Sequence, residues 1–306
     1  MPLYTADDLI ANAPLPQPSI VGSGLFPECG TWLITGVTES GKSVLAFDIC
    51  LSLILQQPLF RAFRKKSGQQ GKPYFPVHRP CKILYLDNEV GPQGCHARLK
   101  SFMAARGIQV PFGDYFKLIS GDYDPLLLHK LATDEKPFKN LCKLIIEQRP
   151  DILVVDPFGD YHVEDEDSNK MRVVFRYLRQ LQHEFKFASI LLHHESDKQS
   201  FTRDGHAIQK EGTGRSRGHS CIAQSVDTYL AIKRSSKQSQ HFLEPSWEKV
   251  RHQKHPPSGQ LFVDLERMHI EWFCSNREQG IPAKQQAFLD AYRASVARAG
   301  DDLDDE

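Results

Sequence analysis

From Gly30 onward the chain alternates short runs of apolar residues with longer segments in which apolar residues recur at helical spacing. The runs are TWLIT (31–35), KILYLD (82–87), FKLIS (116–120), DILVVD (151–156) and ASILLHH (188–194). The segments between them are SVLAFDICLSLILQQ (43–57), 93–106, 137–148 and 168–185. Strands that are apolar on both faces and alternate with helices indicate a parallel sheet covered on both sides. We therefore predict an α/β fold with a mainly parallel central sheet.

The chain after Cys221 consists of short β-like pieces. They are VDTYLAIKR (226–234), LEPSWEKVR (243–251), QLFVDLE (260–266) and HIEWF (269–273). We predict that they extend the far edge of the sheet as antiparallel strands. Two polar stretches are predicted to be loops because they have turn chemistry and no apolar period: the basic residues 61–80, with six Lys or Arg, and residues 196–219.

The two ends of the chain differ from this main part. Residues 1–28 are rich in proline after a short helical patch at 7–13, and we expect a lead segment that packs on the main domain. The predicted main domain covers residues 29–275. Residues 276–306 are predicted to form a helix near 283–298 and an acidic tail, DDLDDE.

Composition narrows the class of protein. The formal net charge is zero, so any nucleic-acid site must be a local patch. Seven scattered cysteines without a CxxC pair argue against a disulfide framework and a structural zinc site. No run approaches the roughly 18 apolar residues of a membrane span, and the N-terminus lacks signal-peptide features. We therefore expect a cytoplasmic protein with no membrane partner.

A phosphate-binding pattern follows the first strand. The stretch GVTESGKS (36–43) matches G-x-x-x-x-G-K-[ST] between a strand and a helix, the context in which backbone N–H groups surround a phosphate. Lys42 is expected to reach the β- and γ-phosphates of ATP, and Ser43 to bind Mg²⁺. The predicted nucleotide-binding residues are Gly36, Thr38, Glu39, Ser40, Gly41, Lys42, Ser43 and Val44. Glu39 fits this loop only if its carboxylate faces outward.

Two acids end neighbouring strands of the predicted sheet. Asp156 ends ILVVD, where P-loop nucleotidases carry an acid that holds Mg²⁺. Glu89 follows KILYLD and is placed to orient the attacking water, with Asp87 as the alternative. His193 and His194 end another strand, and adjacent strand residues point to opposite sides, so a shared metal ion is disfavoured. One of the two histidines is instead expected to sense the γ-phosphate.

Taken together these motifs resemble the RepA-type plasmid and phage replicative helicases, a branch of the RecA/DnaB-like hexameric P-loop ATPases. The resemblance covers roughly residues 7–272. It is carried by GLFPECGTWLITGVTESGKS (24–43), ILYLDNE (83–89), ILVVDPFGDYHVEDEDSNKMRVVFRYLRQL (152–181), ILLHHESDK (190–198) and SRGHS (216–220) with Asp227. It implies a RecA-like ATPase domain in a homo-oligomeric ring, commonly a hexamer, that hydrolyses ATP between subunits and moves along single-stranded DNA.

The resemblance also implies roles for individual residues. It implies Glu89 as the catalytic base, Asp156 at Mg²⁺ and His194, with His193 as the alternative, as the γ-phosphate sensor. Arg217, or the K-x-R pair Lys249 and Arg251, would enter the site of a neighbouring subunit.

Several partners and functions are compatible with these motifs. Cations of the loop at 197–220 are candidates for binding single-stranded DNA: Lys198, Arg203, Lys210 and Arg215. The acidic tail is a candidate contact for a primase or another replication protein. The leading hypothesis is a replicative-type helicase that couples ATP hydrolysis to translocation or unwinding. The alternatives are a RecA- or KaiC-like ATPase in recombination or regulation, and a nucleotide-gated DNA-binding module without helicase activity.

Overall fold

The computed structural model describes residues 5–6, 18–61, 63–66, 69–109, 112–120, 125–164, 170–194, 200–201, 207–208, 221–234 and 242–274. Within them, nine strands form one sheet in the order β15-β14-β13-β12-β3-β9-β8-β6-β7. They are β3 (Thr31–Gly36), β6 (Ile83–Asp87), β7 (Phe116–Ser120), β8 (Ile152–Asp156), β9 (Ala188–His194), β12 (Thr228–Arg234), β13 (Phe242–Val250), β14 (Gly259–Asp264) and β15 (His269–Cys274). The mainly parallel α/β fold predicted from the sequence is confirmed.

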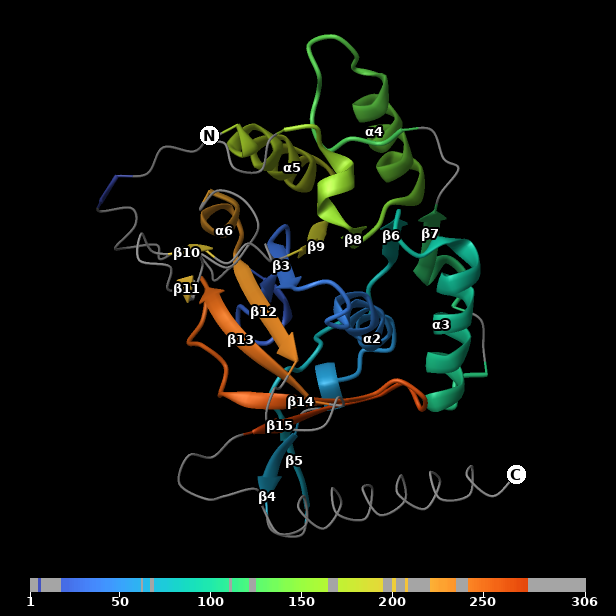
Figure 1. The fold of residues 1–306 in the computed structure, drawn as a ribbon, viewed down its shortest axis with the longest axis vertical. Helices are drawn as coiled ribbons and strands as arrows, with labels where there is room; N and C mark the ends of the chain where they lie inside the picture. Colours follow the sequence, from blue (N-terminus) through green and yellow to red (C-terminus); the bar gives the residue numbers. More distant parts are fainter. Residues whose placement is uncertain are drawn as a thin grey trace.

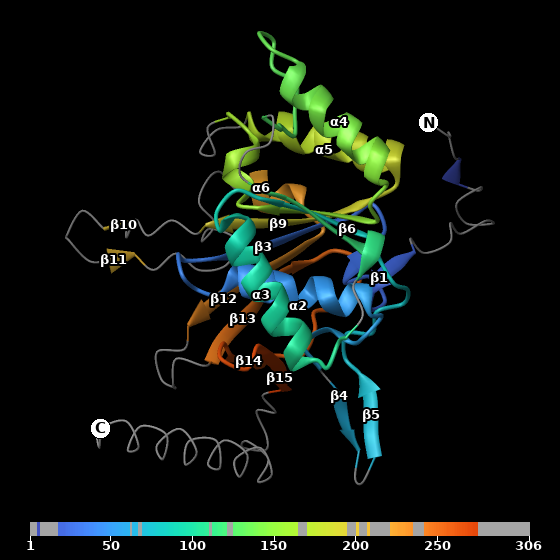
Figure 2. The ribbon, with the colours of Figure 1, turned by 90° about the vertical axis from the view of Figure 1, so that its right-hand side faces the viewer.

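Helices cover both faces of this sheet (Figures 1 and 2). They are α2 (Lys42–Ile54), α3 (Gly91–Ala105), α4 (Lys136–Gln148), α5 (Met171–Phe185) and the short α6 (Cys221–Ser225). Helices α2 and α3 lie on one face, and α4 and α5 lie side by side on the other. Among the helices that the structure describes, none is long and apolar enough to cross a bilayer.

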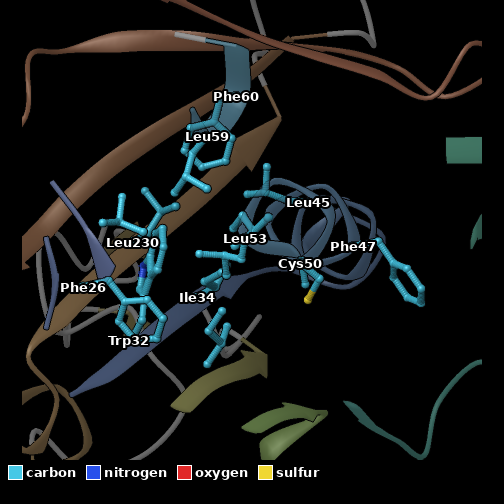
Figure 3. Packing of buried hydrophobic residues seen from close by; sticks show 14 of the residues in the cluster. Phe26, Trp32, Ile34, Leu45, Phe47, Cys50, Leu53, Leu59, Phe60 and Leu230 are labelled. Carbon is cyan, nitrogen blue, oxygen red and sulfur yellow. The ribbon is translucent and has the colours of Figure 1, made fainter. Parts of the chain in front are cut away.

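The alternation of side chains along β3 explains why both faces are covered. Trp32 and Ile34 belong to the core cluster on the α2 side, where Figure 3 shows them beside Leu53. Leu33, between them, belongs to the cluster that α5 completes with Leu178. Because successive residues of a strand point to opposite faces, this run of apolar residues requires a helical layer on each side.

One strand direction was predicted wrongly. Strands β13, β14 and β15 are antiparallel to their neighbours, as expected, but β12 is parallel to β3, with Thr228 opposite Trp32. The reason is helix α6, which the apolar pattern did not reveal. It belongs to the connection that returns the chain from the end of β9 to the edge where β3 begins, so β12 runs in the direction of β3.

The predicted basic loop at 61–80 is also partly wrong. The chain forms a hairpin of β4 (Phe63–Lys66) and β5 (Gln69–Pro73), after a 3-10 turn at Leu59–Arg61. Phe75 is buried and its ring lies 5.2 Å from that of Trp272. The charged composition of the segment did not indicate this buried ring, which anchors the chain after β5 in the core.

Small elements complete the fold. Strands β1 (Ser19–Val21) and β2 (Phe26–Pro27) pair with each other, and their residues Ile20 and Phe26 are buried in the main core. Strands β10 (Ser200–Phe201) and β11 (Ala207–Ile208) pair within the predicted loop at 196–219, which is therefore not wholly irregular. Short 3-10 turns occupy Gly113–Tyr115 and Phe158–Tyr161. The predicted helices at 7–13 and 283–298 and the acidic tail lie outside the described residues.

Candidate nucleotide-binding site

The loop at 36–43 joins the carboxyl end of β3 to the first turn of α2. Two of its residues have left-handed backbones, Glu39 with φ 59° and Gly41 with φ 90°. At Gly36 a Cβ atom would lie 2.5 Å from the hydroxyl oxygen of Ser40 and 2.8 Å from the carbonyl oxygen of Ile232. Only glycine fits this position, so close packing explains why the motif begins with a glycine.

Lys42 is the buried cation of this loop. Its side chain is 5% exposed, and its Nζ donates to the carbonyl oxygens of Gly36 at 3.0 Å and Val37 at 2.9 Å. These contacts hold the ammonium group at the loop, beside the N-terminus of α2, where the first N–H groups have no carbonyl partner within the helix. Glu39 and Thr38 are exposed, so the carboxylate of Glu39 faces outward, the orientation that the motif requires. The loop therefore has the charge and the donors of an anion site.

Asp156 ends β8 next to this loop. Its Oδ2 accepts a hydrogen bond of 2.7 Å from the hydroxyl of Tyr85, and its Oδ1 is buried with no hydrogen bond from the residues that the structure describes. Burial, together with the charges of Glu89 and Asp87, raises the pKa of Asp156 to about 6, although Tyr85 and Ser43 act to lower it. Such an oxygen needs a compensating cation when it is ionised.

The two acids near the end of β6 have different surroundings. The carboxylate of Asp87 accepts hydrogen bonds from the N–H groups of Val90 at 3.3 Å and Gly91 at 2.8 Å, and from the hydroxyl of Ser120 at 2.8 Å. Asp87 therefore fixes the start of α3. Glu89 is exposed, and its charge acts on the pKa of Asp156. Of the two, Glu89 has the carboxylate available to water beside the loop.

The two histidines of β9 lie on opposite faces of the sheet. His194 has its Nδ1 3.3 Å from Nζ of Lys42. His193 is 2% exposed, and its ring lies 6.0 Å from that of Phe158 on the α5 side. Register explains the position of His194, because it pairs with Gly36 at the start of the loop. Of the two sensor candidates, His194 is the one that reaches the phosphate loop.

The K-x-R pair lies at the amino edge of the parallel strands, opposite the edge that carries the phosphate loop. Nζ of Lys249 donates to the carbonyl oxygens of Ala223 at 2.9 Å and Gln224 at 2.8 Å, and Arg251 pairs with Asp227 at 3.2 Å. Burial, and next the charge of Arg251, lower the pKa of Lys249 to about 8. Both cations hold the end of α6 in their own chain. The other predicted cations lie outside the described residues: Lys198, Arg203, Lys210, Arg215 and Arg217.

The residues at the carboxyl edge fit a nucleotide with Mg²⁺. Lys42 and the first turn of α2 offer positive charge and N–H donors to phosphates, while Ser43 and the buried Oδ1 of Asp156 offer the oxygen ligands that Mg²⁺ prefers. Bound Mg²⁺ would neutralise charge on the phosphates. Sequence reasoning missed the contribution of Tyr85 to this site. The only indication was the hydroxyl that this tyrosine brings into a strand that is otherwise apolar up to Asp87.

Comparison with known proteins agrees with this geometry. A family model described as an AAA domain matches residues 2–200. The match contains the loop at 36–43, Glu89, Asp156 and His194, and it ends before α6. A search of curated proteins found no match.

Proposed function

The chain belongs to the AAA domain family of P-loop ATPases, and on that premise we propose that it works as a head-to-tail oligomer that couples ATP hydrolysis to movement along single-stranded DNA. The family that the sequence resembles suggests a ring of six subunits. One observation carries the proposal: the phosphate loop follows the carboxyl end of β3, whereas the K-x-R cations at the end of β13 lie level with the amino end of β3.

Strand register gives the scale of this separation. Val250 pairs with Thr228, which pairs with Trp32, whereas the loop begins at Gly36, four residues further along β3. At 3.3 Å per residue the two levels differ by about 13 Å, before the lengths of the loop and of Arg251 in the other direction are added. Lys249 and Arg251 therefore have no role at their own phosphate loop.

A second copy removes this obstacle. If the amino edge of one sheet faces the carboxyl edge of the next, Arg251 of one subunit meets the phosphates held by Lys42 of its neighbour. Such an interface is heterologous, and repeated it gives a ring or a helical filament. An arginine supplied in this way is typically worth about 10³–10⁵ in rate. Arg251 must then exchange its contact with Asp227 for the phosphate.

The residues of the carboxyl edge have separate tasks in this proposal. Lys42 holds the phosphates, Asp156 and Ser43 hold Mg²⁺, and Glu89 orients water for in-line attack. His194 contacts Lys42 and begins the connection whose cations, Lys198, Arg203, Lys210 and Arg215, are the proposed DNA contacts. A change in phosphate occupancy at His194 would thus reach the DNA-binding segment directly.

ATP turnover with and without single-stranded DNA tests the coupling. We expect DNA to stimulate the wild type, Glu89→Gln to abolish turnover while still binding ATP, and forked duplex to be unwound. Turnover without stimulation by DNA would favour a regulatory ATPase of the same fold. If Glu89→Gln hydrolyses ATP at the wild-type rate, the assigned base is wrong.

Mixing two inactive variants tests the head-to-tail arrangement. Arg251→Ala keeps an intact phosphate loop, and Lys42→Ala keeps an intact arginine, so turnover should reappear only in the mixture. Arg79→Ala is the matched control, because Arg79 also bridges acids at the amino edge, Glu28 and Asp151, but is not a proposed trans residue. Arg251→Ala with the wild-type rate, or a mixture that stays inactive while both variants associate, would refute a trans role.

A further inference from the structure

A basic groove is lined by residues of α4 and α5, the end of α6 and Arg251. Figures 1 and 2 show α4 and α5 on the face of the sheet opposite α2, the helix that follows the phosphate loop. Its volume is about 1430 Å³. The basic residues that line it are Lys130, Arg172, Arg176, Arg179, His183 and Arg251, against a single acid, Glu184. In a chain with no net charge this is a concentration of basic residues, of which the proposed nucleotide site uses Arg251 alone.

Three arginines and a histidine of this lining form one stripe along α5. Arg172, Arg176, Arg179 and His183 follow one another at steps of four, three and four residues, which places them on one side of the helix, and all four are exposed. Arg179 donates to the carbonyl oxygen of Ser225 at 2.6 Å, which ties the stripe to the end of α6. Among the described residues, neither Arg172 nor Arg176 makes an ion pair. From the first to the last cation the stripe is about 16 Å long.

Apolar side chains lie beside this stripe. The rings of Phe138 on α4 and Tyr177 on α5 are 5.4 Å apart, and Lys130 lies 5.9 Å above the ring of Phe138. Ile146 is 52% exposed and lines the same groove. The groove thus matches a ligand that combines several negative charges with an apolar group.

The chain itself contains such a ligand, and we propose that this groove binds the acidic C-terminal segment 301–306. Its sequence, DDLDDE, places Leu303 among five acids. Six extended residues span about 16 Å, the length of the stripe on α5. Acids then face the row of cations, and the leucine is available to the apolar side of the groove.

The length of the connecting chain permits this contact. Residues 275–300 lie between β15 and the segment, and even a wholly helical chain of 26 residues spans about 39 Å. Across the sheet, six interstrand spacings separate β15 from β8, and together they amount to a distance of about 29 Å. A tethered segment has an effective concentration in the millimolar range, which favours it over a free polyanion such as DNA.

Fluorescence anisotropy of a labelled peptide with the sequence of residues 300–306 tests the proposal without relying on hydrolysis. The receptor is the full chain with its five tail acids replaced by amides: Asp301→Asn, Asp302→Asn, Asp304→Asn, Asp305→Asn and Glu306→Gln. We expect the peptide to bind this receptor at least about tenfold more tightly than the wild type, whose own tail competes. Salt should weaken the binding.

Charge reversal in the groove identifies the site. Adding Arg172→Glu and Arg176→Glu to the receptor should lower peptide affinity at least about tenfold. Lys143→Glu on α4, an exposed cation outside the groove, should change it less than about twofold. Thermal melting checks that each variant is folded.

Three outcomes would overturn the proposal. The first is equal peptide binding by the wild type and the amide receptor. The second is peptide binding that survives the reversal of both arginines. The third is an amide receptor that does not bind the peptide but binds a labelled oligothymidine, and that loses this binding when the charges of both arginines are reversed. That result would assign the groove to nucleic acid.

Discussion

Replacing Tyr85 with phenylalanine tests whether its hydroxyl orients the carboxylate expected to face Mg²⁺. Tyr85 is fully buried, its hydroxyl donates to Oδ2 of Asp156 over 2.7 Å, and its ring lies 4.9 Å from that of Phe47 on α2. Phenylalanine keeps the ring and its packing and removes one oxygen. The carboxylate of Asp156 then loses the contact that fixes the position of its Oδ2, and with it the orientation of the whole group.

Two known magnitudes bound the effect. A hydrogen bond to a charged group contributes about 1.5–3 kcal/mol to stability. Loss of a residue that orients a metal ligand typically lowers metal affinity about 10–100-fold, or about 1.4–2.7 kcal/mol. The two ranges overlap because the same hydrogen bond is removed in both. We therefore expect the half-saturating Mg²⁺ concentration to rise at least about tenfold.

Titration of Mg²⁺ into the protein with a fluorescent ATP analogue measures this concentration. A pH of about 8 keeps Asp156, with its pKa of about 6, ionised in the wild type. Tyr229→Phe is the matched control, because Tyr229 is equally buried but its hydroxyl contacts Thr35, 3.3 Å away. If both variants need the same Mg²⁺ as the wild type while both melt lower, the hydroxyl of Tyr85 only stabilises the fold and the reasoning is wrong.

Three further predictions concern stability and the phosphate loop. Burial lowers the pKa of His162 to about 4, so the folded state disfavours the protonated ring. The free energy of unfolding should therefore be fully present above about pH 6.5 and fall by about 2 kcal/mol at about pH 5. Urea unfolding at both pH values measures this loss, and His162→Phe should remove most of the difference. Arg106→Met leaves the buried carboxylate of Asp48 without its ion pair and should lower the free energy of unfolding in urea by about 3–5 kcal/mol. Adding Asp48→Leu should restore most of this loss. Equal losses in the single and double variants would contradict this. Gly36→Ala brings a Cβ within 2.8 Å of the carbonyl oxygen of Ile232 and should abolish binding of the ATP analogue, and unaltered affinity would show that the loop adapts.

The parallel core could be predicted because its signals are local. Residues 152–156 of β8 are buried throughout, so both faces must be apolar and the run is visible in the sequence. The motif of the phosphate loop is equally local, because its eight residues are consecutive and the left-handed backbone at position 41 favours glycine. These two signals together predict which edge of the sheet carries the site.

The features that were missed depend on contacts distant in the sequence. The direction of β12 depends on α6, a helix of five residues that is too short to give a periodic signal. The hydroxyl of Tyr85 meets Asp156 only because β6 and β8 are neighbours in register. For Lys249 and Arg251 the resemblance implies a role in a neighbouring subunit, and no local pattern indicates that they also bind carbonyl groups at the end of α6.

Strand β9 gives the phosphate loop a direct mechanical connection to the opposite face of the sheet. His194 contacts Lys42 on one face, and the residue before it, His193, packs against Phe158 on the other. The ring of Phe158 also lies 4.7 Å from His162 and 5.6 Å from Phe175 of α5. Because successive residues of a strand point to opposite faces and the interior is close-packed, these adjacent histidines contact both sides of the sheet at one point. The end of β9 therefore links the phosphate loop to the aromatic cluster beside α5 through two adjacent residues.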